Sequence, residues 1–148
     1  MTEILFYHLE QSSLERVLPL LLDKTLERGW KAVVEVGSDE RADALDGALW
    51  TWRDDSFLPH GKVGDGAETL QPVLLTTGQD NPNGGNVRFF ADRAVPRDGE
   101  GYDRIVYLFN GHDPDAVVEA RSAWKSLAEN NACTYWQQNS NGQWEKKA

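Results

Sequence analysis

Three side chains near the carboxyl end of the chain have types and spacing suited to binding an acidic peptide. Arg121, Trp124 and Lys125 stand at positions i, i+3 and i+4 of an expected helix, so a guanidinium, an indole and an ammonium fall on adjoining surface. Residues 121–148 carry four basic and two acidic groups, whereas residues 1–120 carry eleven basic and twenty-two acidic groups. The pattern predicts a docking site for an acidic tail with an apolar anchor. The plainer alternative is that Trp124 belongs to the core and the two cations are solvated at its edge.

The glycine-rich segments do not match a phosphate-binding motif. A P-loop needs Gly-Lys-Ser/Thr ahead of a helix, and that tripeptide does not occur in this chain. A dinucleotide-binding motif needs Gly-x-Gly-x-x-Gly directly after the first strand, where the chain has Glu10-Gln11-Ser12-Ser13. We therefore assign Gly64-x-Gly66 and Gly84-Gly85 to turns.

The other reactive side chains are scattered. His8, His60 and His112 lie far apart with no His-x-x-x-His pair, and a lone histidine is most simply structural or solvated. Cys133 falls in an expected strand and is most simply an inert buried thiol. The adjacent pair Asp54-Asp55 falls in a loop, where carboxylates are usually solvated. We therefore expect no metal site, no cofactor and no catalytic residue.

The composition is typical of a folded protein of the cytosol. The chain has 148 residues, 40% of them hydrophobic and 26% charged, with a formal net charge of −9. That charge argues against free binding to duplex DNA or to an anionic membrane, because both require a basic field. No apolar run approaches the roughly 18–20 residues of a membrane span, and the first residues lack the features of a signal peptide. We expect a cytoplasmic protein with a single domain over residues 1–148.

Capping signals and apolar spacing predict three helices. Ser12 and Glu15 have capping-box spacing for a first helix that ends at Gly29. Pro19 conflicts with that helix, because proline removes one backbone hydrogen bond, and predicts either a kink or a helix that begins there. Ser38 is the expected cap of the second helix.

Asp113 and Pro114 are the expected cap and first residue of the third helix, which ends near Asn130. Its expected buried stripe is Val117, Ala120, Trp124 and Leu127.

Apolar runs predict strands at residues 4–9, 31–36, 72–76, 87–90, 104–109 and 133–137. Strands and helices alternate at the start and the end of the chain, which favours helices on both faces of a parallel sheet. We therefore predict an α/β protein with a three-layer α/β/α architecture. Its central sheet is mostly parallel, and the last strand is free to run antiparallel and make the sheet mixed.

Several segments together resemble a known family. They are Phe6-Tyr7-His8-Leu9, residues 48–61 with Leu49-Trp50 and Ser56-Phe57-Leu58-Pro59-His60-Gly61, Pro72-Val73-Leu74-Leu75-Thr76, Asp80-Asn81-Pro82-Asn83-Gly84, Ala120-Arg121-x-x-Trp124-Lys125 and Thr134-Tyr135-Trp136-Gln137-Gln138. Over nearly its whole length the chain resembles the chi subunit of bacterial DNA polymerase III holoenzyme, in its alphaproteobacterial form. The block at residues 48–61 is the most specific of these segments.

The resemblance implies a non-catalytic adaptor of the clamp-loader assembly. Chi-like proteins bind the acidic C-terminal tail of single-stranded DNA-binding protein, and they bind the psi subunit. The tail-binding arginine of the family falls on Arg121, its neighbouring aromatic on Trp124 and the following basic residue on Lys125. The aromatics on the psi side fall on Trp50 and Phe57.

Two alternatives to the adaptor remain open at this point. One is a small enzyme on a nucleotide-binding-like α/β sheet, and the other is a structural subunit with no tail pocket. Psi is recognisable in only some bacteria that have chi, so the Trp50–Phe57 surface could also serve another clamp-loader component or a helicase-like partner.

Overall fold

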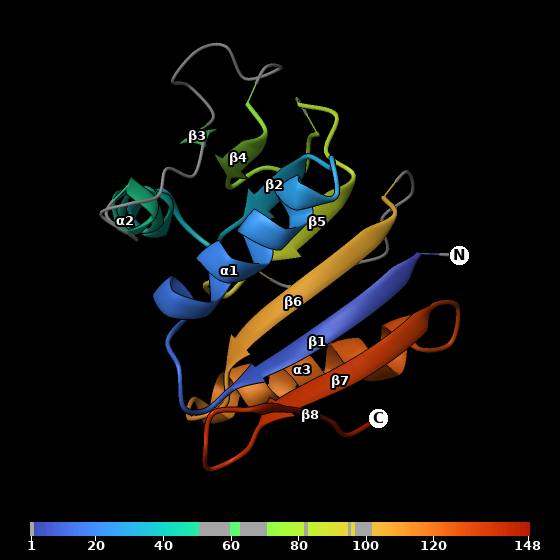
Figure 1. Ribbon diagram of the computed structural model, residues 1–148. Coiled ribbons are helices and arrows are strands. Elements are labelled where there is room, and N and C mark those ends of the chain that lie inside the picture. The colour runs from blue at the N-terminus through green and yellow to red at the C-terminus, as the bar shows by residue number, and fades with distance from the viewer. Residues whose placement is uncertain (1, 51–59, 63–70, 82, 95, 97–101) are drawn as a thin grey trace.

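The described residues of the computed structural model are 2–50, 60–62, 71–81, 83–94, 96 and 102–148, and they form one continuous sheet with helices on both faces (Figure 1). In chain order the elements are β1 (Glu3–Leu9), α1 (Leu14–Glu27), β2 (Ala32–Glu35), α2 (Asp39–Trp50), β3 (Gly61–Lys62), β4 (Val73–Thr76), β5 (Val87–Phe90), β6 (Arg104–Asn110), α3 (Pro114–Leu127), β7 (Ala132–Gln138) and β8 (Trp144–Lys146). All six predicted strands and all three predicted helices are present. The short strands β3 and β8 were not predicted from the sequence.

The sheet has the strand order β3-β4-β2-β5-β6-β1-β7-β8 within the described residues. Every neighbouring pair is parallel except β7 and β8. The prediction of a mostly parallel, mixed sheet is confirmed. The last strand of the sheet is antiparallel, but that strand is not the run predicted at 133–137, here β7, which pairs in parallel with β1. The antiparallel strand is β8, which a turn at Gly142 (φ 78°) joins to β7 as a hairpin.

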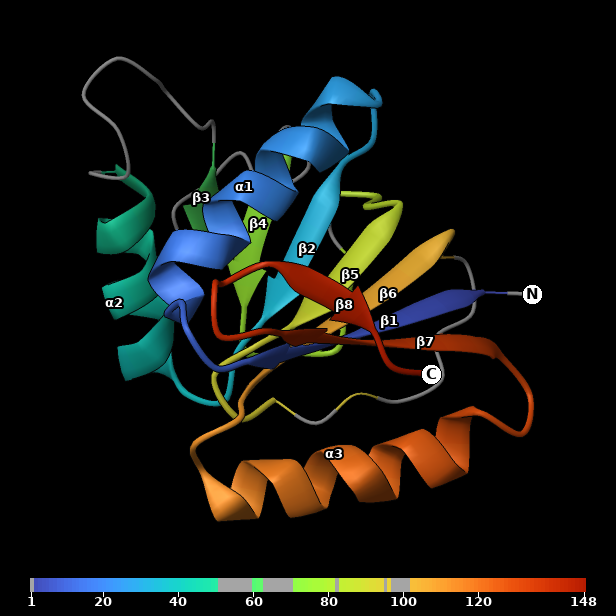
Figure 2. The same ribbon diagram turned by 60° about the horizontal axis from the view of Figure 1, so that its bottom comes forward.

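The helices divide between the two faces of the sheet, which confirms the three-layer α/β/α fold (Figure 2). α1 and α2 share one apolar cluster with strands β2, β4, β5 and β6, to which they contribute Leu18, Leu22 and Leu45. α3 closes a second, aromatic-rich cluster on the opposite face with Phe6, Phe90, Tyr107 and Phe109. None of the helices in the described part of the chain combines the length and apolarity that a membrane crossing demands.

The helix caps show which local signals the fold uses. Ser38 caps α2 as predicted, since its hydroxyl accepts a hydrogen bond from the backbone N–H of Arg41 at 3.3 Å. The capping box predicted at Ser12 is wrong. The N-cap of α1 is Ser13, which makes no side-chain capping bond. The hydroxyl of Ser12 instead accepts a hydrogen bond from the side chain of Gln138.

Pro19 lies inside α1, whose first residue is Leu14, so the alternative that the helix begins at Pro19 was wrong. The side chain of Pro19 is buried against the core, where packing can offset the missing backbone hydrogen bond. At the other end of α1, Gly29 has φ 79° and ends the helix as predicted.

Candidate functional site

α3 carries the three side chains that the sequence singled out. Its N-cap is Asp113, as predicted, and the carboxylate accepts hydrogen bonds from the backbone N–H groups of Asp115 and Ala116 at 3.0 and 3.4 Å. Pro114 is the first helical residue, where its missing N–H is tolerated. Residues next to each other in the chain, Asp113 and Pro114, therefore determine where α3 begins. The starting point of the helix in turn sets which of its side chains face the sheet.

The buried face of α3 differs from the predicted stripe. Its buried residues are Ala116, Ala120, Ala123 and Leu127. Val117 and Trp124, which were predicted to be buried, are only half-buried. Alanine side chains are small, so the helix can approach the aromatic face of the sheet along that row. Trp124 is too large for the row and packs beside it, against Phe6 of β1 and Tyr135 of β7.

Arg121 and Lys125 are exposed on α3, and Trp124 lies between them, half-buried. The indole packs edge-on against Phe6, with ring centroids 5.2 Å apart, and against Tyr135, with centroids 5.9 Å apart. This geometry is compatible with both interpretations made from the sequence, and the docking site stays a prediction. Trp124 rests on the core, as the plainer alternative required, and it still leaves surface beside two cations.

The two cations of α3 differ from the paired arginines elsewhere. Within the described residues, neither Arg121 nor Lys125 has an ion-pair partner, whereas Arg93 bridges Asp113 at 3.0 Å and Glu119 at 2.7 Å. A cation without an internal carboxylate is available to an external one. In a chain with a net charge of −9, such a position on an aromatic surface is a candidate anion site.

His8 and Tyr135 form a polar cluster next to Arg121. His8 Nδ1 lies 2.6 Å from the hydroxyl of Tyr135, and His8 Nε2 lies 3.2 Å from the Glu10 carboxylate. Burial lowers the pKa of His8, Glu10 opposes that shift, and the charges of His112 and Arg121 lower the pKa further. Burial raises the pKa of Tyr135, and the charge of Arg121 partly offsets the rise. The Arg121 guanidinium thus acts electrostatically on both rings.

His8 and Tyr135 were not among the site residues predicted from the sequence. They come from β1 and β7, which pair in parallel with Phe6 opposite Tyr135 and His8 opposite Gln137. The available signal was the motif Thr134-Tyr135-Trp136, whose alternation along a strand puts Tyr135 on one face of the sheet and Trp136 on the other. The aromatic residues of the basic carboxyl-terminal region therefore divide between two surfaces.

The second set of predicted site residues falls at the limit of the described chain. Trp50 is the last residue of α2, and nothing is described of its side chain. Phe57 lies outside the described residues. A surface shared by the two aromatics stays a prediction from the family resemblance.

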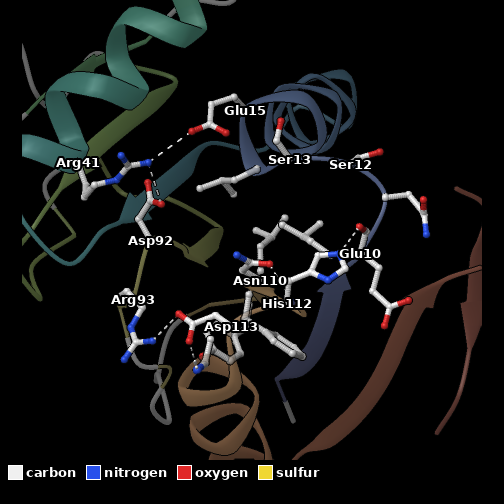
Figure 3. Close-up of a pocket in the computed structure, with 17 residues that line it drawn as sticks. Glu10, Ser12, Ser13, Glu15, Arg41, Asp92, Arg93, Asn110, His112 and Asp113 are labelled. Carbon is white, nitrogen blue, oxygen red and sulfur yellow. Dashed lines mark hydrogen bonds and ion pairs between the residues drawn. The ribbon is translucent and has the colours of Figure 1, made fainter.

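A crevice of about 500 Å³ lies beyond the carboxyl ends of β1 and β6 (Figure 3). The chain leaves β1 through α1 on one face and leaves β6 through α3 on the other. This arrangement is the topological switch point where α/β sheets commonly bind ligands. The crevice is therefore where a nucleotide-binding enzyme of this fold would hold its ligand, and its lining decides whether a phosphate fits.

Three consecutive backbone N–H groups after β1 form an anion-binding nest at this switch point, and the side chain of Gln138 already occupies it. Its side-chain oxygen accepts hydrogen bonds from the consecutive N–H groups of Glu10, Gln11 and Ser12 at 3.1, 2.9 and 3.1 Å. Consecutive N–H groups after the first strand are what a P-loop offers to a phosphate. In this chain they are satisfied from within, by a side chain that is only 4% exposed.

The cations in the crevice are also engaged by carboxylates (Figure 3). Arg41 contacts Asp92 at 3.1 Å and Glu15 at 3.4 Å, and Arg93 contacts Asp113. Burial raises the pKa of Asp92, although its hydrogen bond to Arg41 opposes the shift. The lining is thus poorly suited to a polyphosphate.

The three histidines and the cysteine do not form one cluster, although His8 and His112 both contact Glu10. His60 is buried and lies 3.0 Å from Asp46, remote from His8 and His112 in the fold. Cys133 is half-buried on β7. Among the described residues, no group of three or more histidine, cysteine, aspartate and glutamate side chains is placed to hold a metal ion.

Comparison with known proteins gives the family. The family model for "DNA polymerase III chi subunit, HolC" matches residues 1–133, which include all of α3. This chain belongs to the chi subunit family of DNA polymerase III. The chi resemblance expected from the motifs is confirmed.

Two curated chi proteins are similar to the chain. The Rickettsia prowazekii (strain Madrid E) protein, named "Probable DNA polymerase III subunit chi", is 26% identical over 87 residues, which cover 59% of this chain and 53% of the relative. The Pseudomonas aeruginosa protein named "DNA polymerase III subunit chi" is 29% identical over 86 residues, which cover 56% of this chain and 59% of the relative. The chain thus spans little more than half the length of these chi relatives.

Proposed function

We propose that this chi-family chain is a non-catalytic adaptor of the DNA polymerase III clamp-loader assembly. It acts in the cytoplasm as one domain over residues 1–148. It binds the acidic C-terminal tail of single-stranded DNA-binding protein through Arg121, Trp124 and Lys125. It links that tail to psi or another clamp-loader component through a surface that includes Trp50 and Phe57, and it does not bind duplex DNA by itself.

The observation that carries this proposal is the pair of unpartnered cations beside a half-exposed indole on α3. Within the described residues, Arg121 and Lys125 lack ion pairs, and Trp124 is held in place by Phe6 and Tyr135. Holding the indole by ring packing lowers the entropy that a ligand must remove on binding. The net charge of −9 repels polyanions in general, so a local cationic and aromatic surface favours one acidic segment over others.

Each of the three residues has its own role in holding a tail that ends in a free carboxylate. The planar guanidinium of Arg121 can hold both carboxylate oxygens at once, which a lysine cannot do. Trp124 offers an apolar surface to the terminal side chain. Lys125 attracts the acidic residues upstream without fixed geometry, so its contribution falls as salt screens it.

The test is a titration of the purified protein with a fluorescent acidic peptide that ends in Asp-apolar-Pro-Phe. A hydrogen bond to a charged group contributes about 1.5–3 kcal/mol, so Arg121→Ala should weaken binding roughly 10- to 150-fold. Arg121→Lys should recover part of that loss, and Lys125→Ala should cost less. The matched control is Arg28→Ala, an exposed arginine at the carboxyl end of α1, on the other face of the sheet, which should leave the affinity unchanged.

A double-mutant cycle identifies the contact. Amidating the peptide removes the terminal carboxylate, so it should weaken binding to the wild type far more than to Arg121→Ala, because both changes remove the same interaction. If the two losses simply add, Arg121 does not hold the carboxylate. Omitting the terminal Phe tests Trp124 in the same way.

The enzyme alternative is less well supported by the switch-point crevice. A nucleotide-binding enzyme needs free N–H groups after its first strand, and the side chain of Gln138 occupies those of Glu10, Gln11 and Ser12. ATP hydrolysis that is lost on mutating a residue of this chain would overturn the non-catalytic assignment.

A further inference from the structure

Aromatic side chains also gather on the face of the sheet opposite Trp124. Tyr7 on β1 and Trp136 on β7 are neighbours in the register of the two paired strands. Trp144 on β8 packs edge-on against Tyr7, with ring centroids 5.0 Å apart. All three rings are half-buried. α1 covers one face of the sheet (Figure 2), and its residues line a hollow together with the three aromatic residues, so the rings lie between this helix and the β7–β8 hairpin at the edge of the sheet.

These rings form the floor of a groove of about 420 Å³. Its wall on α1 includes Val17, Leu21 and Leu20, and Leu20 is 46% exposed. A second hollow, of about 590 Å³, continues the groove past Tyr7, Leu21 and Lys24 toward the other end of α1. Among the described residues, Leu20 and Val118 are the large aliphatic side chains that remain exposed. We call the first hollow the α1–hairpin groove.

The charge of the α1–hairpin groove is the reverse of that of the chain. Its lining includes Arg16 and Lys24 and no aspartate or glutamate. Both cations are exposed, and neither has an ion-pair partner among the described residues. Arg16, Leu20 and Lys24 follow one another at four-residue spacing, so a cation, an apolar side chain and a second cation form one stripe about 12 Å long on α1.

We propose that the α1–hairpin groove docks an acidic amphipathic helix of a partner protein. A helix laid along α1 presents carboxylates eight residues apart to Arg16 and Lys24. Its apolar side chains between them would contact Leu20 and the aromatic floor. The occupant is thus defined by charge complementarity and by the spacing of the stripe. This docking site is separate from the tail site, because α1 and α3 lie on opposite faces of the sheet (Figure 2).

Two other occupants fit less well. A second copy of the chain would bring another net charge of −9 to a molecule that already carries it. Single-stranded DNA binds to basic tracks with exposed aromatic faces, whereas Tyr7 and Trp144 are packed edge-to-face against each other and the α1 wall is aliphatic. Both occupants are measured as outcomes of the test.

The probe is a fluorescein-labelled peptide of about 16 residues, long enough to form a helix, with glutamates eight residues apart and leucine and phenylalanine on the same face between them. Acetylated and amidated ends remove the free carboxylate that the Arg121 site would bind. The wild-type protein should bind it saturably by fluorescence anisotropy, and a peptide with lysine in place of glutamate should not bind.

Three variants locate the binding. Leu20→Glu and the double variant Arg16→Glu/Lys24→Glu should each weaken the peptide at least about tenfold. The matched control is Val118→Glu, which changes the other exposed aliphatic side chain, on α3, and should have no effect. Arg121→Ala should also have no effect, so loss of the tail site and loss of the groove are distinguishable. Because Leu20, Arg16 and Lys24 are exposed, circular dichroism should show unchanged folding.

Several results would overturn the proposal. They are no saturable binding of the peptide to the wild type, binding that survives both groove variants, and equal loss with Val118→Glu. If oligo(dT) binds the wild type and the groove variants abolish that binding, the surface contacts nucleic acid instead. If the same variants abolish self-association in sedimentation, the occupant is a second copy.

Discussion

Gln138 joins the end of the sheet to the loop between β1 and α1, and replacing it should destabilise the protein strongly. Its oxygen accepts the three N–H bonds of residues 10–12, and its nitrogen donates to Ser12 Oγ at 3.1 Å and to the carbonyl of Gly142 at 3.4 Å. Gln138→Leu keeps a similar volume and removes every one of these bonds. The three backbone donors then depend on water for a partner.

The magnitude follows from the exposure of those donors. A hydrogen bond contributes about 0.5–1.5 kcal/mol, and a buried donor left unsatisfied costs about 1–3 kcal/mol. Glu10 and Ser12 are half-buried and Gln11 is exposed, so water can reach part of the nest and the lower values apply. We expect a loss of roughly 3 kcal/mol in the free energy of unfolding, about 1 kcal/mol for each N–H group. For a domain of this length that corresponds to a fall in Tm of roughly 6–12 °C.

The assay is thermal and urea unfolding followed by circular dichroism, with the denaturant m value checked for constancy. Gln138→Glu retains an acceptor for the N–H groups at the start of α1 and should lose less than half as much stability. The matched control is Gln143→Leu, an exposed glutamine of the same hairpin, which should change stability by no more than about 0.5 kcal/mol. A Tm for Gln138→Leu within about 2 °C of wild type would refute the reasoning, as would a Gln138→Glu variant as unstable as Gln138→Leu.

Two further predictions concern the tail site and the Trp50–Phe57 surface. Burial holds the pKa of His8 below its ordinary value of 6.5, so its NMR titration midpoint should lie below 6.5, rise in Arg121→Ala, and rise when the acidic tail peptide binds. The pKa of His8 is lower in the folded than in the unfolded protein, so His8 contributes to the stability of the fold above pH 6.5, and this contribution is lost as the pH falls through the folded pKa. A titration midpoint at or above 6.5 in the free protein would contradict the prediction that burial lowers the pKa of His8. Trp50→Ala or Phe57→Ala should weaken association with the clamp loader in a pull-down while tail-peptide affinity survives. Equal loss of both activities would indicate misfolding, and loss of neither would remove the proposed surface.

The elements and their order could be predicted because their signals are local. Apolar periodicity located six strands and three helices, and Ser38 and Asp113 marked the starts of α2 and α3 through short-range capping. The same 3.6-residue period put Arg121 and Lys125 beside Trp124 on one helix, as the structure has them. The family followed from motifs such as Leu49-Trp50 with Ser56-Phe57, which lie close together in the chain.

Only the tertiary structure decided which distant residues meet. Pairing of β1 with β7 brings His8 to Tyr135, 127 positions along the chain, and the oxygen of Gln138 to three amides near the start. Arg88, in an apolar run expected to be a strand, is 2% exposed and binds Glu35, 53 residues away. Such contacts depend on strand order and register, which no local period encodes. For the same reason the sequence placed the carboxyl-terminal aromatics in one basic region, whereas the alternation of β7 and the turn to β8 distribute them over two faces of the sheet.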